Sequence, residues 1–524
     1  MPNYLVRTSD MKVVKGSEVQ EGYCTLSYSW NQSGEIVINE TGKKSHRRID
    51  QGKHKIIFPG KTVPKKPRGR KRIPGKVKFV KFEGIIQEIC KDFNIKYIWY
   101  DQMCINQDDE EEKHNEIREM HKIYSNAHCK VALIPDLKIF SYGPEKSTGG
   151  AITHNLDLGA FSMTQWMKRM WTLEETVMSS RMLFVGSNIH AWWYCLPAIY
   201  FPLFYKQFAN SAARILHCAH TRTSTKEHDH VFALANIFPD VMKEITIDYN
   251  QDIQELMIQF YGALAKKDLS ILCFGPYHLY KSICRTSSSD GVKGDNIKEL
   301  EYEVPITKFV LPSWTGVDGE HYYSSNYQTS FKNYTVIGRV MQITCSGMTN
   351  DQHEASISTL SSDTLDDIPP LPQQEINEYC EWRLGIRVKV PNSTNEKRLV
   401  LCEWCSAETQ RDDKGCEHVI QELRNLSYFM PINKKNFEWI NIKPWGSNIS
   451  IHFPRLTEVL QDDTQYVLLI GVQFTDSGSR RSLPSYPIIK KHKNCYKAIG
   501  LCSIKGIDYL LNDIPLQEQT FDIY

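Results

Sequence analysis

The segment from Trp99 to Asp109 places an acid, several amides and a thiol directly after an apolar strand pattern. Asp101 opens this polar group, and aspartates in turns commonly accept hydrogen bonds from backbone N–H groups. We therefore expect Asp101 to brace the following loop rather than to act in catalysis. Cys104 precedes His114 and His121, but no spacing rule links them. We interpret Cys104 as a small, half-buried thiol and not as a nucleophile.

A second set of chemically capable side chains lies far downstream, at Cys402, Cys405, Cys416 and His418. The first pair has the Cys-x-x-Cys spacing of zinc ligands, whereas the second pair, Cys-x-His, is one residue tighter than usual. Two cysteines within a strand or turn also suit ordinary packing. Zinc is therefore the weaker interpretation, and no bound metal is expected with certainty.

A basic insertion spans residues 43–81, where sixteen Lys or Arg stand against one acid, Asp50. Prolines and glycines interrupt it, which predicts a loop. Its segment 65–72 contains Arg68-Gly69-Arg70 and could enter a minor groove or act as a nuclear localisation signal. A solvated loop is the favoured interpretation, because like charges repel and stay exposed.

The elements that must position these side chains follow an α/β pattern. Apolar residues at three- and four-residue steps indicate helices, and short β-rich runs indicate strands. Strands are predicted at 23–30, 95–101, 130–134 and 181–186, with helices between them near 82–93, 109–127 and 163–179. Asp108 or Asp109 is the expected cap of the second of these helices. Strand and helix alternating in this way predict a parallel sheet with flanking helices.

The rest of the chain changes character. Helical patterns continue to about residue 266, and strand patterns dominate after about residue 300. We predict three regions: an α/β domain at 1–190 that includes the basic insertion, a helical extension at 191–320, and a β-rich C-terminal region at 321–524 of unknown role. The flexible connection expected at 349–378 is rich in Ser, Asp, Gln and Pro.

Composition narrows the classes of protein. The net charge of +2 does not commit the whole molecule to nucleic acid or membrane, and no run of about 18 apolar residues could span a bilayer. The 15 cysteines are odd in number and scattered singly, unlike a disulfide scaffold. A cytoplasmic, or else nuclear, protein with reduced thiols is the expectation.

Several blocks, in this order along the chain, resemble the fungal heterokaryon-incompatibility (HET) domain. They are the strand at 23–30, the segment 99–109, the run Arg169-Met170-Trp171-Thr172-Leu173-Glu174-Glu175, the pair Arg222-Thr223 with Asp229-His230-Val231-Phe232, and Ile247-Asp248-Tyr249. The resemblance covers residues 20–180 strongly and 215–315 more loosely. It implies a fungal intracellular protein of self/non-self recognition, linked to regulated cell death.

The same region resembles the Toll/interleukin-receptor (TIR) fold, which implies a flavodoxin-like sheet of order 2-1-3-4-5. Several TIR domains cleave NAD with a glutamate four residues after a tryptophan, and Trp171 and Glu175 hold that spacing. A carboxylate beside the ribose would stabilise an oxocarbenium-like centre. On this resemblance Glu175 is the candidate catalytic residue, and the candidate substrate-binding residues are Tyr28, Trp30, Asp101, Arg169 and Trp171.

Simpler interpretations of the same residues exist. Trp171 also suits an apolar core, and Glu174 and Glu175 suit a solvated helix face. Three functional hypotheses therefore stand. The favoured one is a signalling protein that self-associates or assembles with protein partners. The alternative is an NAD nucleosidase with NAD as its substrate, and the third is a nuclear regulator that uses the basic insertion.

Overall fold

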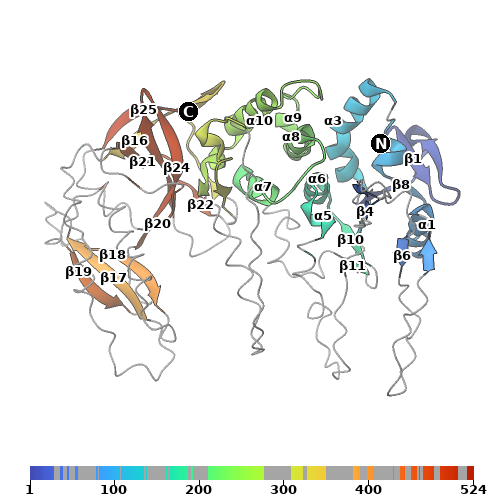
Figure 1. Cartoon of the computed structure of the whole chain (residues 1–524), viewed down its shortest axis with the longest axis horizontal. Helices are drawn as coiled ribbons and strands as arrows, with labels where there is room; N and C mark the ends of the chain where they lie inside the picture. The colour runs from blue at the N-terminus through green and yellow to red at the C-terminus, as the bar shows by residue number, and fades with distance from the viewer. Residues whose placement is uncertain are drawn as a thin grey trace, which may run out of the picture. The chain divides into compact units, whose positions relative to one another are not determined.

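A computed structural model of the chain describes residues 1–28, 36–38, 44–46, 54–56, 78–80, 82–106, 108–134, 137, 161, 164–186, 190–192, 211–275, 309–322, 327–349, 382–389, 398–405, 429, 437–442, 450–456, 460, 464–476, 484–505 and 516–524. The chain divides into two compact units (Figure 1). Unit 1 comprises Met1–Asn210 and Cys218–Leu256, and unit 2 comprises Ser211–His217 and Met257–Tyr524.

Unit 1 is built on a seven-stranded sheet of order β11-β10-β9-β3-β8-β1-β2. Its strands are β1 (Tyr4–Arg7), β2 (Lys12–Lys15), β3 (Cys24–Ser27), β8 (Tyr97–Trp99), β9 (Cys129–Leu133), β10 (Met182–Val185) and β11 (His190–Trp192). The four inner strands β8, β3, β9 and β10 are parallel, and the pairs at both edges are antiparallel. The predicted parallel sheet is confirmed, and its four strands have the order 2-1-3-4. The antiparallel edges were not predicted.

Helices follow the parallel strands, as the alternating pattern requires. The described helices of unit 1 are α1 (Phe82–Asp92), α2 (Asp101–Cys104), α3 (Glu110–Asn126), α5 (Gln165–Lys168), α6 (Trp171–Met178), α8 (Glu227–Ile237) and α9 (Pro239–Met242). Asp109 caps α3, because its side chain accepts a hydrogen bond from the backbone N–H of Glu112 at 3.0 Å. Helices α3, α6 and α8 pack against one another.

The register of the central strands decides which side chains share a face. Thr25 pairs with Lys130, and Cys24 pairs with Cys129. Because successive side chains point to opposite faces of a sheet, Thr25 and Lys130 lie on one face and the two cysteines on the other. Trp99, opposite Thr25 on β8, meets Tyr124 of α3 edge-to-face with ring centroids 5.4 Å apart. The α3 helix therefore covers the face that carries Lys130.

Unit 2 is rich in strands, as predicted. Its described strands are β12 (Phe274–Gly275), β13 (Glu320–His321), β14 (Tyr327–Gln328), β15 (Tyr334–Ile337), β16 (Val340–Thr349), β17 (Trp382–Lys389), β18 (Arg398–Cys405), β19 (Phe437–Ile442), β20 (Ser450–Leu456), β21 (Tyr466–Leu469), β22 (Thr475–Asp476), β23 (Ser485–His492), β24 (Cys495–Lys505) and β25 (Gln517–Ile523). Strand β25 pairs with both β16 and β24, which closes a barrel-like ring through β21 and β23. A separate sheet has the order β18-β17-β19. The chain passes between the units within α7 (Ala212–Ala219) and α10 (Ile253–Lys267).

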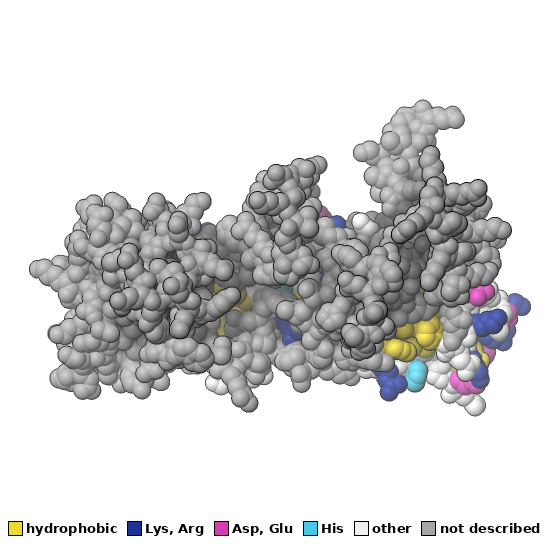
Figure 2. Space-filling model, turned by 90° about the horizontal axis from the view of Figure 1, so that it is seen from below, with side chains coloured by type: hydrophobic (Ala, Val, Ile, Leu, Met, Phe, Trp, Pro, Cys, Tyr) yellow, Lys and Arg dark blue, Asp and Glu magenta, His cyan; other side chains and the backbone are white. Residues whose placement is uncertain are grey.

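Two observations bear on the class of protein expected from the composition. Within the described part of the chain, no helix combines the length and the apolar character needed to cross a membrane. On the face drawn in Figure 2, basic and acidic side chains are intermixed among the described residues. This mixture fits the small net charge of +2.

Candidate functional site

Two predicted site residues meet where strands β3 and β8 end. Tyr28, which follows β3, donates its hydroxyl to Asp101 Oδ1 at 3.0 Å. Asp101 follows β8 and also accepts the backbone N–H of Gln102 at 2.9 Å. Burial, followed by the charge of Asp101, raises the pKa of Tyr28 well above its ordinary value. The contacts of Asp101 are those of a bracing carboxylate. The carboxyl ends of parallel strands are also where ligands bind in open α/β sheets.

Arg169 reaches the same strand end because the predicted helix over 163–179 is broken. In the structure α5 ends at Lys168 and α6 begins at Trp171. Between them Arg169 has extended backbone angles and forms a parallel β-bridge with Thr223. Its guanidinium Nη1 donates to the backbone carbonyl of Tyr28 at 3.0 Å. The single-helix prediction was wrong, because a backbone pairing with a distant segment replaces two helical residues.

Arg222, whose sequence context indicated no role for it, holds this break in place. It is 6 % exposed, and its Nη1 donates to the carbonyl of Arg169 at 2.9 Å and to Thr172 Oγ1 at 2.7 Å. The hydroxyl of Thr172 in turn donates to the carbonyl of Arg169 at 2.7 Å. The signal in the sequence was the pair Arg222-Thr223, which was noted only as part of the family resemblance. The structure shows that this pair positions Arg169.

Glu175 lies on α6, on the side that faces the sheet. It is 6 % exposed, so it does not belong to a solvated helix face. Burial raises the pKa of its carboxyl, while the charge of Lys130 and a hydrogen bond with Ser27 oppose that rise. Trp171, at the start of α6, is half-buried. Trp30 lies outside the described residues.

Lys130 is the unexpected member of this group. It lies on β9, is fully buried, and its Nζ stands 4.4 Å from the ring centroid of Tyr124. Burial lowers the pKa of the amine to about 7, against the opposing effect of Glu175 and Glu174. Within the described residues Nζ has no hydrogen-bond partner. The available signal was a lysine inside the otherwise apolar run 130–134.

Glu174 completes what we call the buried ionisable cluster, defined as Tyr124, Lys130, Glu174 and Glu175. Glu174 is fully buried, and burial followed by the charge of Glu175 raises its pKa well above the usual range. Both of its carboxyl oxygens lack a hydrogen-bond partner among the described residues. Because burial disfavours charged forms, Glu174 tends to keep its proton and Lys130 tends to lose its own, whereas Lys130, Ser27 and Arg169 oppose this effect at Glu175.

Ser27 and Trp166 support the strand end beside the cluster. The indole Nε1 of Trp166, which is fully buried, donates to Ser27 Oγ at 2.7 Å. Trp166 also packs edge-to-face on Phe184 of β10, with ring centroids 5.8 Å apart. These contacts fix α5 against β3 and β10. Acid and hydroxyl groups therefore lie where β3 and β8 end, and the amine of Lys130 lies on the same sheet face beside Thr25. These groups could exchange protons or stabilise a developing positive charge.

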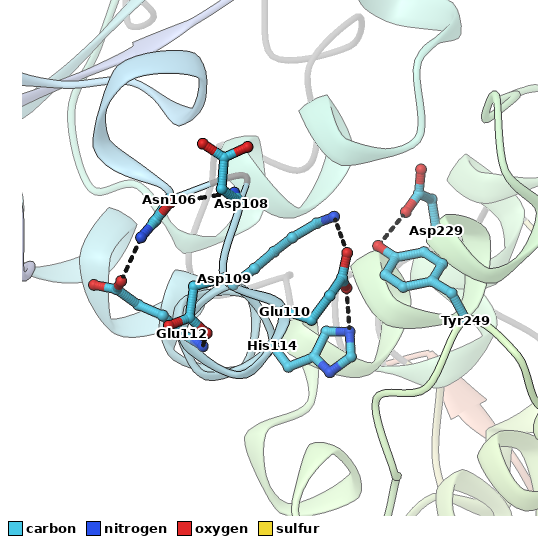
Figure 3. A network of polar contacts seen from close by, with 9 residues as sticks. Asn106, Asp108, Asp109, Glu110, Glu112, His114, Asp229 and Tyr249 are labelled. Atoms are coloured by element: carbon cyan, nitrogen blue, oxygen red, sulfur yellow. Dashed lines mark hydrogen bonds and ion pairs between the residues drawn. The ribbon is translucent and has the colours of Figure 1, made fainter.

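The polar loop after Asp101 is hydrogen-bonded to the start of α3, as Figure 3 shows. Asn106 Nδ2 donates to Glu112 Oε2 at 3.0 Å, and Asn106 Oδ1 accepts the backbone N–H of Asp108 at 3.2 Å. These contacts join the loop to the first turn of α3. Cys104 is fully buried rather than half-buried, and burial raises the pKa of its thiol to about 12. That environment agrees with its interpretation as a packing residue.

The two later blocks of the resemblance also meet in unit 1. Tyr249 donates its hydroxyl to Asp229 Oδ1 at 2.7 Å, as Figure 3 shows. The ammonium of Lys226 stands 4.2 Å from the centroid of the Tyr249 ring. These contacts join the segment around Tyr249 to α8. Packing and hydrogen bonding therefore account for Asp229 and Tyr249 in the later blocks of the resemblance.

The remaining candidate residues fall largely outside what is described. Cys416, His418 and the basic segment 65–72 lie outside the described residues. Cys402 and Cys405 lie on β18, where the structure describes only the backbone. Among the described side chains no group of three or more His, Cys, Asp or Glu could hold a metal ion. Zinc binding at these four positions stays a prediction.

Comparison with known proteins finds one family match. No curated protein and no solved structure matches it. Residues 23–175 match the family model described as heterokaryon incompatibility protein (HET). This segment begins just before β3 and ends at Glu175. It therefore includes the parallel strands β3, β8 and β9 and all four residues of the buried ionisable cluster. Over residues 23–175 the chain is therefore similar to the HET family.

Proposed function

We propose that the chain acts in a response of the heterokaryon-incompatibility type, in which non-self recognition triggers regulated cell death. The observation that carries this proposal is the family match over residues 23–175. The domain would signal by self-association or by assembly with a protein partner. The β-rich unit would then sense the trigger or regulate the domain.

Inducible expression of the full chain in a filamentous fungus tests this proposal. The expected result is growth arrest and cell death upon induction. The matched control is Arg222→Met, which removes the support of Arg169 and should weaken the response in proportion to the loss of folded protein. Normal growth of cells that accumulate the folded wild-type chain, alone and with candidate non-self partners, would contradict the proposal.

A second candidate is cleavage of NAD by the HET domain. It is favoured by the contacts that bring Tyr28, Asp101 and Arg169 to one strand end, and by the electrostatic coupling of Glu175 to both Asp101 and Arg169. Nicotinamide would leave neutral, and positive charge would grow on the ribose. Glu175, in its ionised form, would stabilise that charge, and the guanidinium of Arg169 would contact the diphosphate.

The chain offers a matched pair of variants for the enzymatic hypothesis. Glu175→Gln removes the proposed catalytic charge, whereas Glu174→Gln changes the adjacent buried carboxyl, which has no proposed role in substrate binding. Purified full-length chain should release nicotinamide from NAD, Glu174→Gln should retain this activity, and Glu175→Gln should lose it. Equal activity of the two variants, or no NAD loss by folded and assembled wild type, would refute the enzymatic hypothesis. Cell death that survives Glu175→Gln would favour the adaptor.

A further inference from the structure

A pair of thiols lies on the face of the unit 1 sheet opposite Lys130. Cys24 begins β3 and Cys129 begins β9, and the two residues are register partners on these adjacent parallel strands. Their Sγ atoms are 3.3 Å apart, within hydrogen-bond distance. Both cysteines are free thiols in this structure. We call this pair the sheet dithiol.

The backbone around the sheet dithiol already suits a disulfide. Adjacent strands are about 4.7–4.9 Å apart, inside the range of about 4.4–6.8 Å between the Cα atoms of bridged cysteines. The two sulfurs would have to approach by roughly 1.3 Å from their present 3.3 Å separation to reach bonding distance. Rotation of the side chains, without a change of strand register, is the movement required.

The electrostatic environment of the pair favours Cys24 over Cys129 as the attacking thiol. A hydrogen bond from Cys129 lowers the pKa of the Cys24 thiol, although burial opposes this effect. The same hydrogen bond, followed by burial, raises the pKa of Cys129. Cys24 is therefore the thiol that more readily forms the reactive thiolate, and Cys129 is the partner that keeps its proton.

Exposure separates this pair from the other buried thiols of unit 1. Cys24 and Cys129 are 5 % and 7 % exposed, whereas Cys90 and Cys104 are 1 % and 0 % exposed. The sheet dithiol is therefore less deeply buried than these two thiols. Cys90 of α1 is an electrostatic neighbour of both members, so it is the competing thiol that an experiment must distinguish.

We propose that Cys24 and Cys129 form an oxidisable dithiol that a peroxide converts into a disulfide between β3 and β9. The Cys24 thiolate would attack a peroxide oxygen, which gives a sulfenic acid and, with hydrogen peroxide and one proton, releases one water. The Cys129 sulfur would then attack the sulfenic sulfur, form the S–S bond and release a second water. The net reaction consumes two thiols and one hydrogen peroxide and yields one disulfide and two waters.

The bond would link the strands that carry both sides of the candidate site. Tyr28 directly follows β3, and Lys130 directly follows Cys129 on β9. A covalent bond at the start of these strands would restrict their separation and their shear. The modification would therefore act on the sheet that supports the buried ionisable cluster, whether the HET domain acts as an adaptor or as an enzyme.

Peptide mapping of the full chain tests this proposal without any variant. The reduced protein is treated with hydrogen peroxide, its remaining thiols are blocked, and the non-reduced digest is analysed by mass spectrometry. The expected result is a linked pair of peptides containing Cys24 and Cys129, with a mass lower by about 2 Da than the sum of the two reduced peptides, that separates upon reduction. Cys345, one of the buried thiols of unit 2, has a pKa that burial raises to about 12; it is the internal control and should stay reduced.

Two variants assign the order of the steps. In Cys129→Ala, a sulfenic-acid probe should label Cys24 several-fold more than it labels Cys129 in Cys24→Ala. In Cys90→Ala the link between Cys24 and Cys129 should still form. A link from either residue to Cys90, separate oxidation of Cys24 and Cys129 without a link, or thiols that stay reduced as fully as Cys345 would each overturn the proposal.

Discussion

Replacement of Lys130 by Met tests the electrostatics of the buried ionisable cluster. Methionine matches the length of the lysine stem and removes the amine, which is fully buried and has no hydrogen-bond partner among the described residues. The pKa of Lys130 falls from 10.5 to about 7 in the folded chain. Because the unfolded chain binds the proton over this interval and the folded chain does not, the contribution of Lys130 to stability should rise with pH from 7 towards 10.5 and be lowest below pH 7.

The magnitude follows from the same two pKa values. Burying the amine costs about 4 kcal/mol of folding free energy at pH 7, where about half of the folded molecules carry the proton, and the cost falls to about 1.5 kcal/mol at pH 9.5, from pKa values of 10.5 and about 7. Wild type should therefore gain about 3 kcal/mol relative to Lys130→Met between these pH values. Loss of the amine also removes an attraction that lowers the pKa of Glu174 and Glu175. The higher pKa of these carboxyls in Lys130→Met makes that variant lose more stability as the pH rises, which also favours wild type.

At pH 7 itself, Lys130→Met should be the more stable protein. The loss of the contact between the ammonium and the Tyr124 ring, about 0.5–2 kcal/mol, is smaller than the relieved cost of burying the amine. Replacing buried charged groups by apolar ones of similar volume is often stabilising by about 1–4 kcal/mol, provided that the partners left behind are uncharged. The raised pKa of Glu174 favours that uncharged state.

Urea titration of the full chain at pH 7 and pH 9.5 supplies the measurement. Alkylation of Cys104, which is fully buried in unit 1, reports unfolding of that unit when its peptide is quantified by mass spectrometry. The exposed Lys91 provides the control variant Lys91→Met, which should follow wild type at both pH values. If the midpoints of wild type and Lys130→Met shift in parallel between the two pH values, the amine is not buried in an uncharged form and the reasoning fails.

Three further substitutions test the contacts that position the candidate site, each by the same Cys104 titration at pH 7. Tyr28→Phe removes the hydroxyl that donates to Asp101 and should cost about 2 kcal/mol, with no loss expected if that hydrogen bond is absent in solution. Arg222→Met removes two hydrogen bonds from a charged donor and should cost about 3 kcal/mol, and a neutral result would show that the helix break supports itself. Tyr249→Phe loses one hydrogen bond to a carboxylate and should cost about 1–2 kcal/mol, which an unchanged midpoint would contradict.

Most of the helices and strands could be predicted from the sequence, because each depends on the pattern of residues within one segment. The strand predicted at 130–134 is observed at Cys129–Leu133, and the helix predicted near 109–127 is observed at Glu110–Asn126. The cap of α3 was predicted at Asp108 or Asp109 for the same reason, since a cap and its N–H donor lie three residues apart, and the structure shows that it is Asp109. The sequence also named Tyr28 and Asp101 as candidate site residues, and the structure joins them at the carboxyl ends of adjacent parallel strands.

By itself, therefore, the sequence determined the α/β alternation, the β-rich second half and the HET resemblance, which was placed at residues 20–180 and is matched by the family model at 23–175. Each of these depends on residues close together in the chain or on ordered blocks along it. Only the tertiary structure decided the helix break at Arg169, which requires a bridge to Thr223. It also decided the burial of Lys130 beneath α3 and α6 and the contact of Cys24 with Cys129. These features come from strand register and from pairing between distant segments, and periodicity within one segment carries no information about either.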